Sequence, residues 1–266
     1  MSATAETAAQ SDVGRVTVTQ DGAVATVTLD RAGKHNALTP EMLTDLDAIL
    51  ARVDADRTVH AVVVAGAGDR SFCAGADIRR FTALQPLEMW ATWTRTGLRV
   101  FEHLARLRQP TIAAIHGNAY GGGLELALAC DLRVLADSAT LGLTEVGLGT
   151  VPGWGGTGRL PAAIGAARAK EMIFTGTPVE AQQAAGWGLV NHVVPAADVR
   201  TTAAALAAQI AGRAPIAVQM AKQAIDSGSA YPFMEPLAAV ATAYTDDAVE
   251  GFAAFQEKRA PSFSGS

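Results

Sequence analysis

The first part of the chain alternates apolar and polar residues in two short segments, residues 15–19 and 24–29. Strict alternation is typical of a β-strand with one buried face. The segments are separated by a turn that contains Asp21 and Gly22, and this pair favours a tight hairpin. We therefore predict that the chain begins with two antiparallel strands.

After this hairpin the pattern switches between helical spacing and short, continuous apolar runs. Thr39 followed by Pro40 indicates the start of a helix, and apolar residues then recur at helical spacing to about Val53. A second amphipathic helix is expected over residues 87–107. Buried strands are expected at three apolar runs: residues 61–65, 111–115 and 132–135. This alternation predicts an α/β fold with right-handed crossovers.

Beyond Pro161 the apolar spacing is mainly helical. Five helical segments are expected there: residues 163–174, 180–187, 199–211, 216–227 and, with interruptions, 233–258. No apolar run approaches the roughly 20 residues needed to span a bilayer, so we expect no membrane contact. Residues 1–12 are small, polar and acidic, which predicts a disordered tail rather than a targeting segment.

Composition narrows the class of protein. Hydrophobic residues make up 49% of the 266 residues, enough for a large core without disulfides or metal. The formal net charge is −5 and no predicted helix carries a basic block, so we expect no nucleic-acid partner. Cys73 and Cys130 are the only cysteines, which predicts a reducing compartment, the cytoplasm. The five histidines show no metal-ligand spacing, so no metal is expected.

The most informative stretch places three glycines, Gly121 to Gly123, at the start of an apolar helix that contains Glu125. Tandem glycines expose backbone N–H groups, and the N-terminal end of a helix attracts negative charge. A carboxylate among apolar residues is costly to bury unless it has partners or a function. A tight turn with a hydrogen-bonded glutamate would also explain the pattern. We interpret it as an anion site with an acid/base group.

A second glycine-rich loop, residues 71–79, follows an expected strand in the same way. If both loops face one cavity, each supplies a backbone N–H, and two such donors stabilise an enolate or a tetrahedral oxyanion on an acyl group. Taken alone, Ala74, Gly75 and Ala76 are also compatible with an ordinary turn. The prediction of an oxyanion hole therefore depends on both loops together.

A third glycine-dense stretch, residues 141–160, contains Glu145. A lone glutamate there is more typical of a solvated loop. Paired with Glu125, it would hold one water and share one proton, which suits the addition or removal of water at a carbon–carbon double bond. The chain lacks a complete dinucleotide fingerprint, a phosphate loop, a Gly-x-Ser-x-Gly elbow and a His-Glu-x-x-His motif.

Large apolar side chains gather at the start of the helix expected over residues 87–107. Met89, Trp90 and Trp93, with Phe81 before them, fit either plain core or the wall of an acyl pocket. The spacing alone does not separate these two alternatives.

Four segments together resemble the enoyl-CoA hydratase/isomerase (crotonase) superfamily, and the resemblance runs from about Val13 to Phe263. The segments are residues 72–78, 121–127, 145–157 and 245–259. The resemblance implies a crotonase-type spiral of ββα units with a C-terminal helical trimerisation region. It also implies acyl-CoA substrates, no cofactor other than the CoA of the substrate, and a homotrimer or a homohexamer. The implied parts are a tail (1–12), a spiral core with the active site (13–200) and a helical oligomerisation region (201–266).

Position by position, the resemblance implies roles for single residues. Ala76 and Gly122 would supply the oxyanion-hole N–H groups, and Glu125 and Glu145 would be the catalytic pair. Contacts to CoA or substrate are implied for Ala74, Ala76, Asp77, Ile78, Arg79 and Gly122. A weaker match suggests that Lys258 or Arg259 approaches a CoA phosphate. Three departures from the family pattern, Thr144, Gly158 and Asp246, leave the shape of the acyl pocket open.

The activity that the resemblance implies is syn addition of water to a trans-2-enoyl-CoA, which gives a 3-hydroxyacyl-CoA in fatty-acid or related acyl-CoA catabolism. Isomerisation of a 3-enoyl-CoA, or another lyase or hydrolase reaction on this scaffold, is the first alternative. Retention of Glu125 disfavours the isomerase, which generally uses one carboxylate, at the Glu145 position. A non-catalytic acyl-CoA- or RNA-binding protein is the second alternative, and the mainly acidic helix expected over residues 41–57 disfavours RNA.

Overall fold

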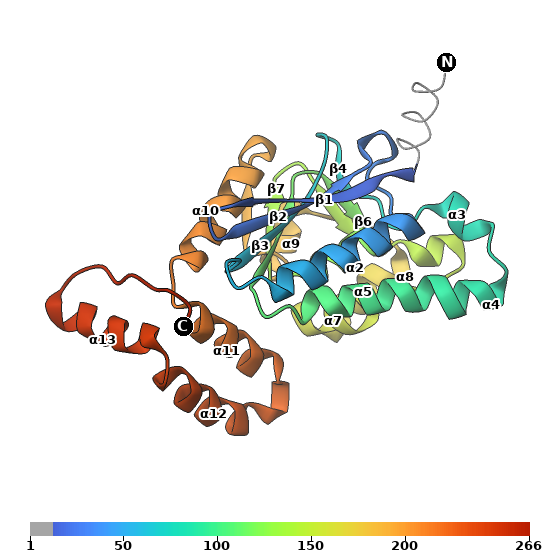
Figure 1. The fold of residues 1–266 in the computed structure, drawn as a ribbon. Coiled ribbons are helices and arrows are strands. Elements are labelled where there is room, and N and C mark those ends of the chain that lie inside the picture. The colour runs from blue at the N-terminus through green and yellow to red at the C-terminus, as the bar shows by residue number, and fades with distance from the viewer. Residues whose placement is uncertain (1–12) are drawn as a thin grey trace, which may run out of the picture.

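The computed structural model describes residues 13–266, so the tail expected at residues 1–12 lies outside the described residues. A six-stranded sheet forms the centre of the molecule, with helices on both faces (Figure 1). Its strands in spatial order are β1 (Arg15–Asp21), β2 (Val24–Asp30), β3 (Ala61–Gly66), β5 (Thr111–Ile115), β7 (Leu132–Ala136) and β10 (His192–Val194). The predicted N-terminal hairpin and the three predicted buried strands are confirmed.

A second, smaller sheet was not expected from the sequence. Its strands in spatial order are β4 (Ser71–Cys73), β6 (Asn118–Tyr120), β8 (Thr140–Gly142) and β9 (Val179–Glu180). Residues 71–79, expected to be a loop, therefore begin with a strand. Strands of two or three residues are too short to show an alternating pattern, which explains why they were missed.

The two sheets together give a repeating unit. A strand of the large sheet is followed by a strand of the small sheet and then by a helix, as in β5, β6 and α6 (Gly122–Leu128). The pairs β3 with β4 and β7 with β8 repeat this order, and helical segments follow both. The predicted α/β class and the spiral of ββα units are confirmed.

Two helices cover opposite faces of the large sheet (Figure 1). Helix α2 (Pro40–Ala55) packs against β1, and Thr39 caps it by accepting a hydrogen bond of 3.2 Å from the N–H of Met42, as predicted. Helix α10 (Val199–Ala211) packs against β3, β5 and β7. The boundary expected at residue 201 thus falls inside a helix that rests on the sheet.

The helix expected over residues 87–107 has three segments in the structure: α4 (Pro86–Glu88), a π-helical segment (Met89–Thr94) and α5 (Arg95–Ala105). The helix expected over residues 163–174 is likewise divided, into α7 (Gly156–Ile164) and α8 (Ala166–Thr175). Gly165 separates them because its φ of 81° interrupts the right-handed helix. Helix α9 (Ala181–Gly186) follows β9.

The last three helices extend away from the core as an arm (Figure 1). They are α11 (Pro215–Asp226), α12 (Tyr231–Ala243) and α13 (Asp246–Glu257). Large apolar side chains are exposed along α12 and α13: Phe233, Leu237, Val240, Tyr244, Val249, Phe252 and Phe255. Within residues 13–266, no helix is both long enough and apolar enough to cross a membrane.

Candidate active site

A cavity of about 230 Å³ lies between the start of α6, the loop after β4 and the segments that follow β8. Six of the eight site residues expected from the sequence line it: Ala74, Ala76, Ile78, Gly122, Glu125 and Glu145. The two glycine-rich loops and both candidate carboxylates therefore meet at one place, although they come from three different ββα units.

The other two expected residues, Asp77 and Arg79, lie beside this cavity. The Asp77 carboxylate accepts a hydrogen bond from the N–H of Arg79 (3.0 Å) and forms an ion pair of 2.7 Å with the buried Arg31. Burial raises the pKa of Asp77, but the hydrogen bond and charge of Arg31 outweigh this and lower it. The Asp77 side chain thus stabilises the loop, while the side chain of Arg79 is exposed.

The backbone of Ala76 faces the start of α6. The N–H of Leu38 donates to the Gly75 carbonyl (2.8 Å), and the N–H of Asp77 donates to the Leu38 carbonyl (2.9 Å). In a parallel bridge of this kind the backbone N–H and C=O of the middle residue, here Ala76, point away from the partner strand, here Leu38. The nitrogen of Ala76 lies 3.6 Å from the point that a Cβ on Gly122 would occupy. The two backbone N–H groups therefore adjoin one another at the cavity.

The glycines at this turn are required by close packing. Gly121 has a φ of 52°, which favours glycine. A Cβ on Gly122 would lie 2.5 Å from Cζ3 of Trp154, and a Cβ on Gly123 would overlap the carbonyl oxygen of Cys73. The predicted close approach of bare backbone is confirmed.

Glu125 lies one turn into α6 and is 2% exposed. Its Oε1 accepts two hydrogen bonds of 2.8 Å from the N–H groups of Trp154 and Gly156, at the start of α7. Burial raises the pKa of Glu125, and these hydrogen bonds and the charge of Arg159 oppose the rise without cancelling it. The carboxylate is thus held in a fixed orientation with one oxygen fully engaged.

Glu145 begins a short 3-10 helix (Glu145–Leu148) and lines the same cavity. Its Oε1 lies 3.3 Å from the point that a Cβ on Gly121 would occupy. No group among residues 13–266 donates a hydrogen bond to its buried Oε2. Burial, aided by repulsion from Glu125, raises the pKa of Glu145 to about 7. A buried oxygen without a partner is suited to bind a ligand or to carry a proton.

Two large aromatic side chains close one side of the cavity. Trp93 from the π-helical segment and Trp154 before α7 both line it, with ring centroids 5.4 Å apart. The sequence pattern left Trp93 open between core and pocket wall, and the structure gives it both roles. The sequence pattern assigned no role to Trp154, although a single aromatic residue within a run of glycines is a usable signal.

Lys258 and Arg259, weakly matched to the family, lie just after α13. The guanidinium of Arg259 binds the Glu250 carboxylate through two hydrogen bonds of 2.6 and 2.8 Å. It also donates to Glu257 at 2.6 Å. Arg259 is thus engaged by two carboxylates of α13, and its contact with CoA stays a prediction.

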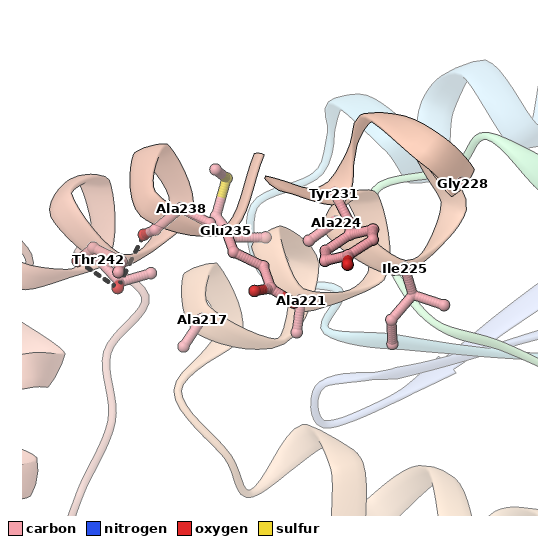
Figure 2. A pocket seen from close by; sticks show the side chains of 11 residues that line it. Ala217, Ala221, Ala224, Ile225, Gly228, Tyr231, Glu235, Ala238 and Thr242 are labelled. Atoms are coloured by element: carbon pink, nitrogen blue, oxygen red, sulfur yellow. Dashed lines mark hydrogen bonds between the residues drawn. The ribbon is translucent and has the colours of Figure 1, made fainter. Parts of the chain in front are cut away.

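A larger hollow, of about 520 Å³, lies between α11 and α12 on the arm (Figure 2). Small side chains line most of it, and Glu235 is the one carboxylate among its lining residues. It therefore offers no pair of acid/base groups. The described part of the chain also contains no cluster of three or more His, Cys, Asp or Glu residues that could hold a metal ion.

Comparisons with known proteins agree with this geometry. A family model for enoyl-CoA hydratase/isomerase matches residues 19–266. The short-chain-enoyl-CoA hydratase of Clostridium acetobutylicum is 38% identical over 253 residues, which cover 93% of this chain and 97% of that protein. The (E)-benzylidenesuccinyl-CoA hydratase of Thauera aromatica is 41% identical over 256 residues, with coverage of 94% and 99%.

Solved structures give the same result. The crystal structure of an enoyl-CoA hydratase from Bacillus anthracis superposes with a TM-score of 0.92 at 40% identity, covering 95% of this chain and 100% of that chain. The family model, the relatives and the shared fold all extend over nearly the whole length. On these grounds the chain belongs to the enoyl-CoA hydratase/isomerase family.

Proposed function

We propose that this protein is an enoyl-CoA hydratase that adds water syn across the double bond of a trans-2-enoyl-CoA to give a 3-hydroxyacyl-CoA. The observation that carries the proposal is the meeting of two carboxylates, Glu125 and Glu145, with the adjoining N–H groups of Ala76 and Gly122 at one cavity. Relatives named as hydratases of CoA thioesters support the same reaction.

In the proposed reaction, the thioester oxygen accepts hydrogen bonds from the N–H groups of Ala76 and Gly122. Water attacks C3 while Glu125 removes its proton, and the π electrons move through C2 and C1 onto the oxygen. The two N–H groups stabilise the resulting enolate, and one such donor typically contributes about 2.7–4 kcal/mol. Glu145 then gives a proton to C2, the carbonyl re-forms, and the product carries the new hydroxyl group on C3.

The surroundings of the two carboxylates support this division of roles. Glu125 receives two backbone hydrogen bonds and the charge of Arg159, which favour its ionised form and hence its action as a base. Glu145 lacks such partners, and its pKa of about 7 keeps a proton available near neutral pH. Two carboxylates in such different surroundings are suited to opposite roles in proton transfer.

The deciding experiment follows the absorbance of the enoyl group with purified protein. Crotonyl-CoA is expected to be hydrated, and a 3-enoyl-CoA is expected to be converted much more slowly. Conversion of the 3-enoyl-CoA without hydration of crotonyl-CoA would show an isomerase instead. Binding of either thioester without conversion would show a non-catalytic protein.

The proposal extends to partners and compartment. We propose that the exposed apolar side chains of α12 and α13 contact other copies in a homotrimer or homohexamer, because large apolar patches mark protein contacts. Hydrodynamic mass tests this.

Hydration is redox-neutral, so the reaction needs no redox cofactor, and CoA enters with the substrate. The buried free thiols of Cys73 and Cys130 support a reducing compartment, the cytoplasm.

A further inference from the structure

The size of the cavity limits what the proposed reaction can accept. Pockets for drug-sized ligands measure about 300–1,000 Å³, whereas this one measures about 230 Å³. The same space must already hold the thioester carbonyl, C2, C3 and the attacking water beside Glu125 and Glu145. Little room is left for the acyl chain beyond C3.

The open side of the cavity identifies where the CoA portion enters. Ile78, Leu148 and Val151 line the cavity and are also largely exposed, so they form its rim. Ile78 belongs to the segment expected to lie along CoA. The thioester thus enters past this rim, and the acyl chain points towards the buried part of the cavity.

The closed side is formed by Trp93 and Trp154, each only 4% exposed. Their ring planes are inclined by 58°, and Phe101 of α5 packs edge-on behind Trp154 with centroids 5.3 Å apart. Both rings are packed into the buried hydrophobic core. An acyl chain that reaches the rings cannot continue past them.

The Trp154 ring is fixed in place by backbone on two sides. A Cβ on Gly97 of α5 would overlap its Cε2 and Nε1 atoms, and a Cβ on Gly122 of α6 would lie 2.5 Å from its Cζ3 atom. The N–H of Trp154 is also bound to Glu125. The ring therefore cannot retreat to lengthen the cavity without moving the oxyanion turn or the proposed base.

Trp93 belongs to the π-helical turn. Such turns are rare and frequently occur at functional sites. Within this segment Met89, Trp93 and Thr94 line the cavity, whereas Trp90 is 60% exposed and lies beside Arg95, with the guanidinium carbon 5.7 Å from the ring centroid. Two tryptophans three positions apart thus have different environments.

We propose that Trp93 and Trp154 form a rigid end wall that restricts this enzyme to short-chain 2-enoyl thioesters. The proposal rests on the hydratase function proposed above. Trp93 determines the length of the pocket through its side chain alone, whereas Trp154 also supports Glu125, so Trp93 is the residue to change.

The test compares kcat/KM for crotonyl-CoA and trans-2-decenoyl-CoA in the wild type, Trp93→Ala and Trp90→Ala. The wild type is expected to prefer crotonyl-CoA by at least about tenfold, and Trp93→Ala to move this ratio at least about tenfold towards decenoyl-CoA. Trp90→Ala, a matched change in the same turn, is expected to keep the wild-type ratio. A purely structural effect of Trp93 would lower kcat/KM for the two thioesters by the same factor.

A wild type that hydrates both thioesters equally well, or a folded Trp93→Ala variant with the wild-type ratio, would overturn the proposal while leaving the hydratase function intact. If Trp93→Ala does not fold, Trp93→Leu, which leaves a smaller cavity, is compared in the same way. A wild type that hydrates neither thioester would refute the hydratase function itself.

Discussion

The N–H of Trp154 donates a hydrogen bond of 2.8 Å to Oε1 of Glu125. The same residue presents its indole ring to the cavity, between Gly97 of α5 and Gly122 of α6. The orientation of the proposed base, the oxyanion turn and the end of the acyl pocket thus depend on one residue. Changes in acyl specificity through Trp154 are expected to alter the rate of hydration as well.

Glu125→Gln is expected to lower kcat for crotonyl-CoA hydration by about 10²–10⁴, because the amide cannot accept the proton of the attacking water. The fold is expected to persist, since the amide oxygen still accepts from the N–H groups of Trp154 and Gly156. Steady-state kinetics with a circular dichroism melt checks both statements. Near-normal turnover in this variant would rule out the two-carboxylate mechanism.

Gly122→Ala tests the oxyanion turn. The added methyl group would lie 2.5 Å from the Trp154 ring and 3.6 Å from the nitrogen of Ala76, where the thioester oxygen is expected to bind. The backbone N–H is kept, but the methyl group would hold the thioester oxygen away from it, so we expect kcat to fall by about 10²–10³, as for the loss of one oxyanion donor. Gly158→Ala is the matched control, because a Cβ there meets open space in α7. Equal rates for the two variants would contradict the role of Gly122.

Glu145→Gln is expected to stabilise the protein more at pH 8 than at pH 5. The pKa of Glu145 is about 7 in the folded chain, against an ordinary value of 4.5. Between these values the folded state binds more protons than the unfolded state, so wild-type stability falls as pH rises through this window. Glutamine does not titrate and escapes this loss. The Tm difference between variant and wild type, measured from pH 5 to pH 8, should widen with pH.

The hydration rate of the Glu145→Gln variant is measured over the same pH range. The variant is expected to lose hydration at every pH, since it cannot give a proton to C2. A Tm difference that stays constant across the window would show that Glu145 is ionised in the folded protein and would remove the reason for treating it as the acid.

Lys222→Met is expected to loosen the arm. Lys222 of α11 is buried and donates to Oδ2 of Asp131 at 2.8 Å and to the Gln109 carbonyl at 3.2 Å. Removing one partner of such a pair typically costs about 3–5 kcal/mol, and we expect the lower part of this range because Asp131 is 25% exposed. Urea unfolding measures the loss. Lys170→Met, on the exposed face of α8, is the control.

A second variant separates charge from packing at this site. The double change Lys222→Met with Asp131→Asn removes both charges and is expected to recover part of the lost stability. If the double variant is no more stable than the single one, the ion pair is not what holds α11 to the core.

Much of the fold follows from hydrophobic spacing. The alternation in residues 24–29 and the apolar run at residues 111–115 predict strands because each is long enough to show a pattern. The strand at residues 118–120 cannot be predicted in this way. Its three residues pair with strands at residues 71–73 and 140–142, so its conformation is set by contacts distant in the sequence.

The candidate site, too, could be predicted only in part from the sequence. Glu125 and Gly122 are conspicuous in the sequence because a carboxylate and bare glycines are costly in an apolar helix. The contact of Glu125 with Trp154 is not visible there, since it joins positions 29 residues apart. It exists because α7 is packed against α6, and spacing along the chain does not contain that information.

Arg159→Met is expected to move the acidic limb of the kcat/KM profile to higher pH. Arg159 donates to the Trp154 carbonyl (3.0 Å) and to the Glu102 carboxylate (2.6 Å). Its charge opposes the rise that burial causes in the pKa of Glu125. Without it that pKa rises further, so less of the base is ionised at pH 6 and activity is lost there more than at pH 8. Rate measurements with crotonyl-CoA from pH 5 to pH 9 test this.

Arg106→Met is the control, because Arg106 also pairs with Glu102 but is largely exposed. An equal loss at every pH in Arg159→Met, with no movement of the limb, would mean that Arg159 acts only by packing and that the ionisation of Glu125 does not depend on it.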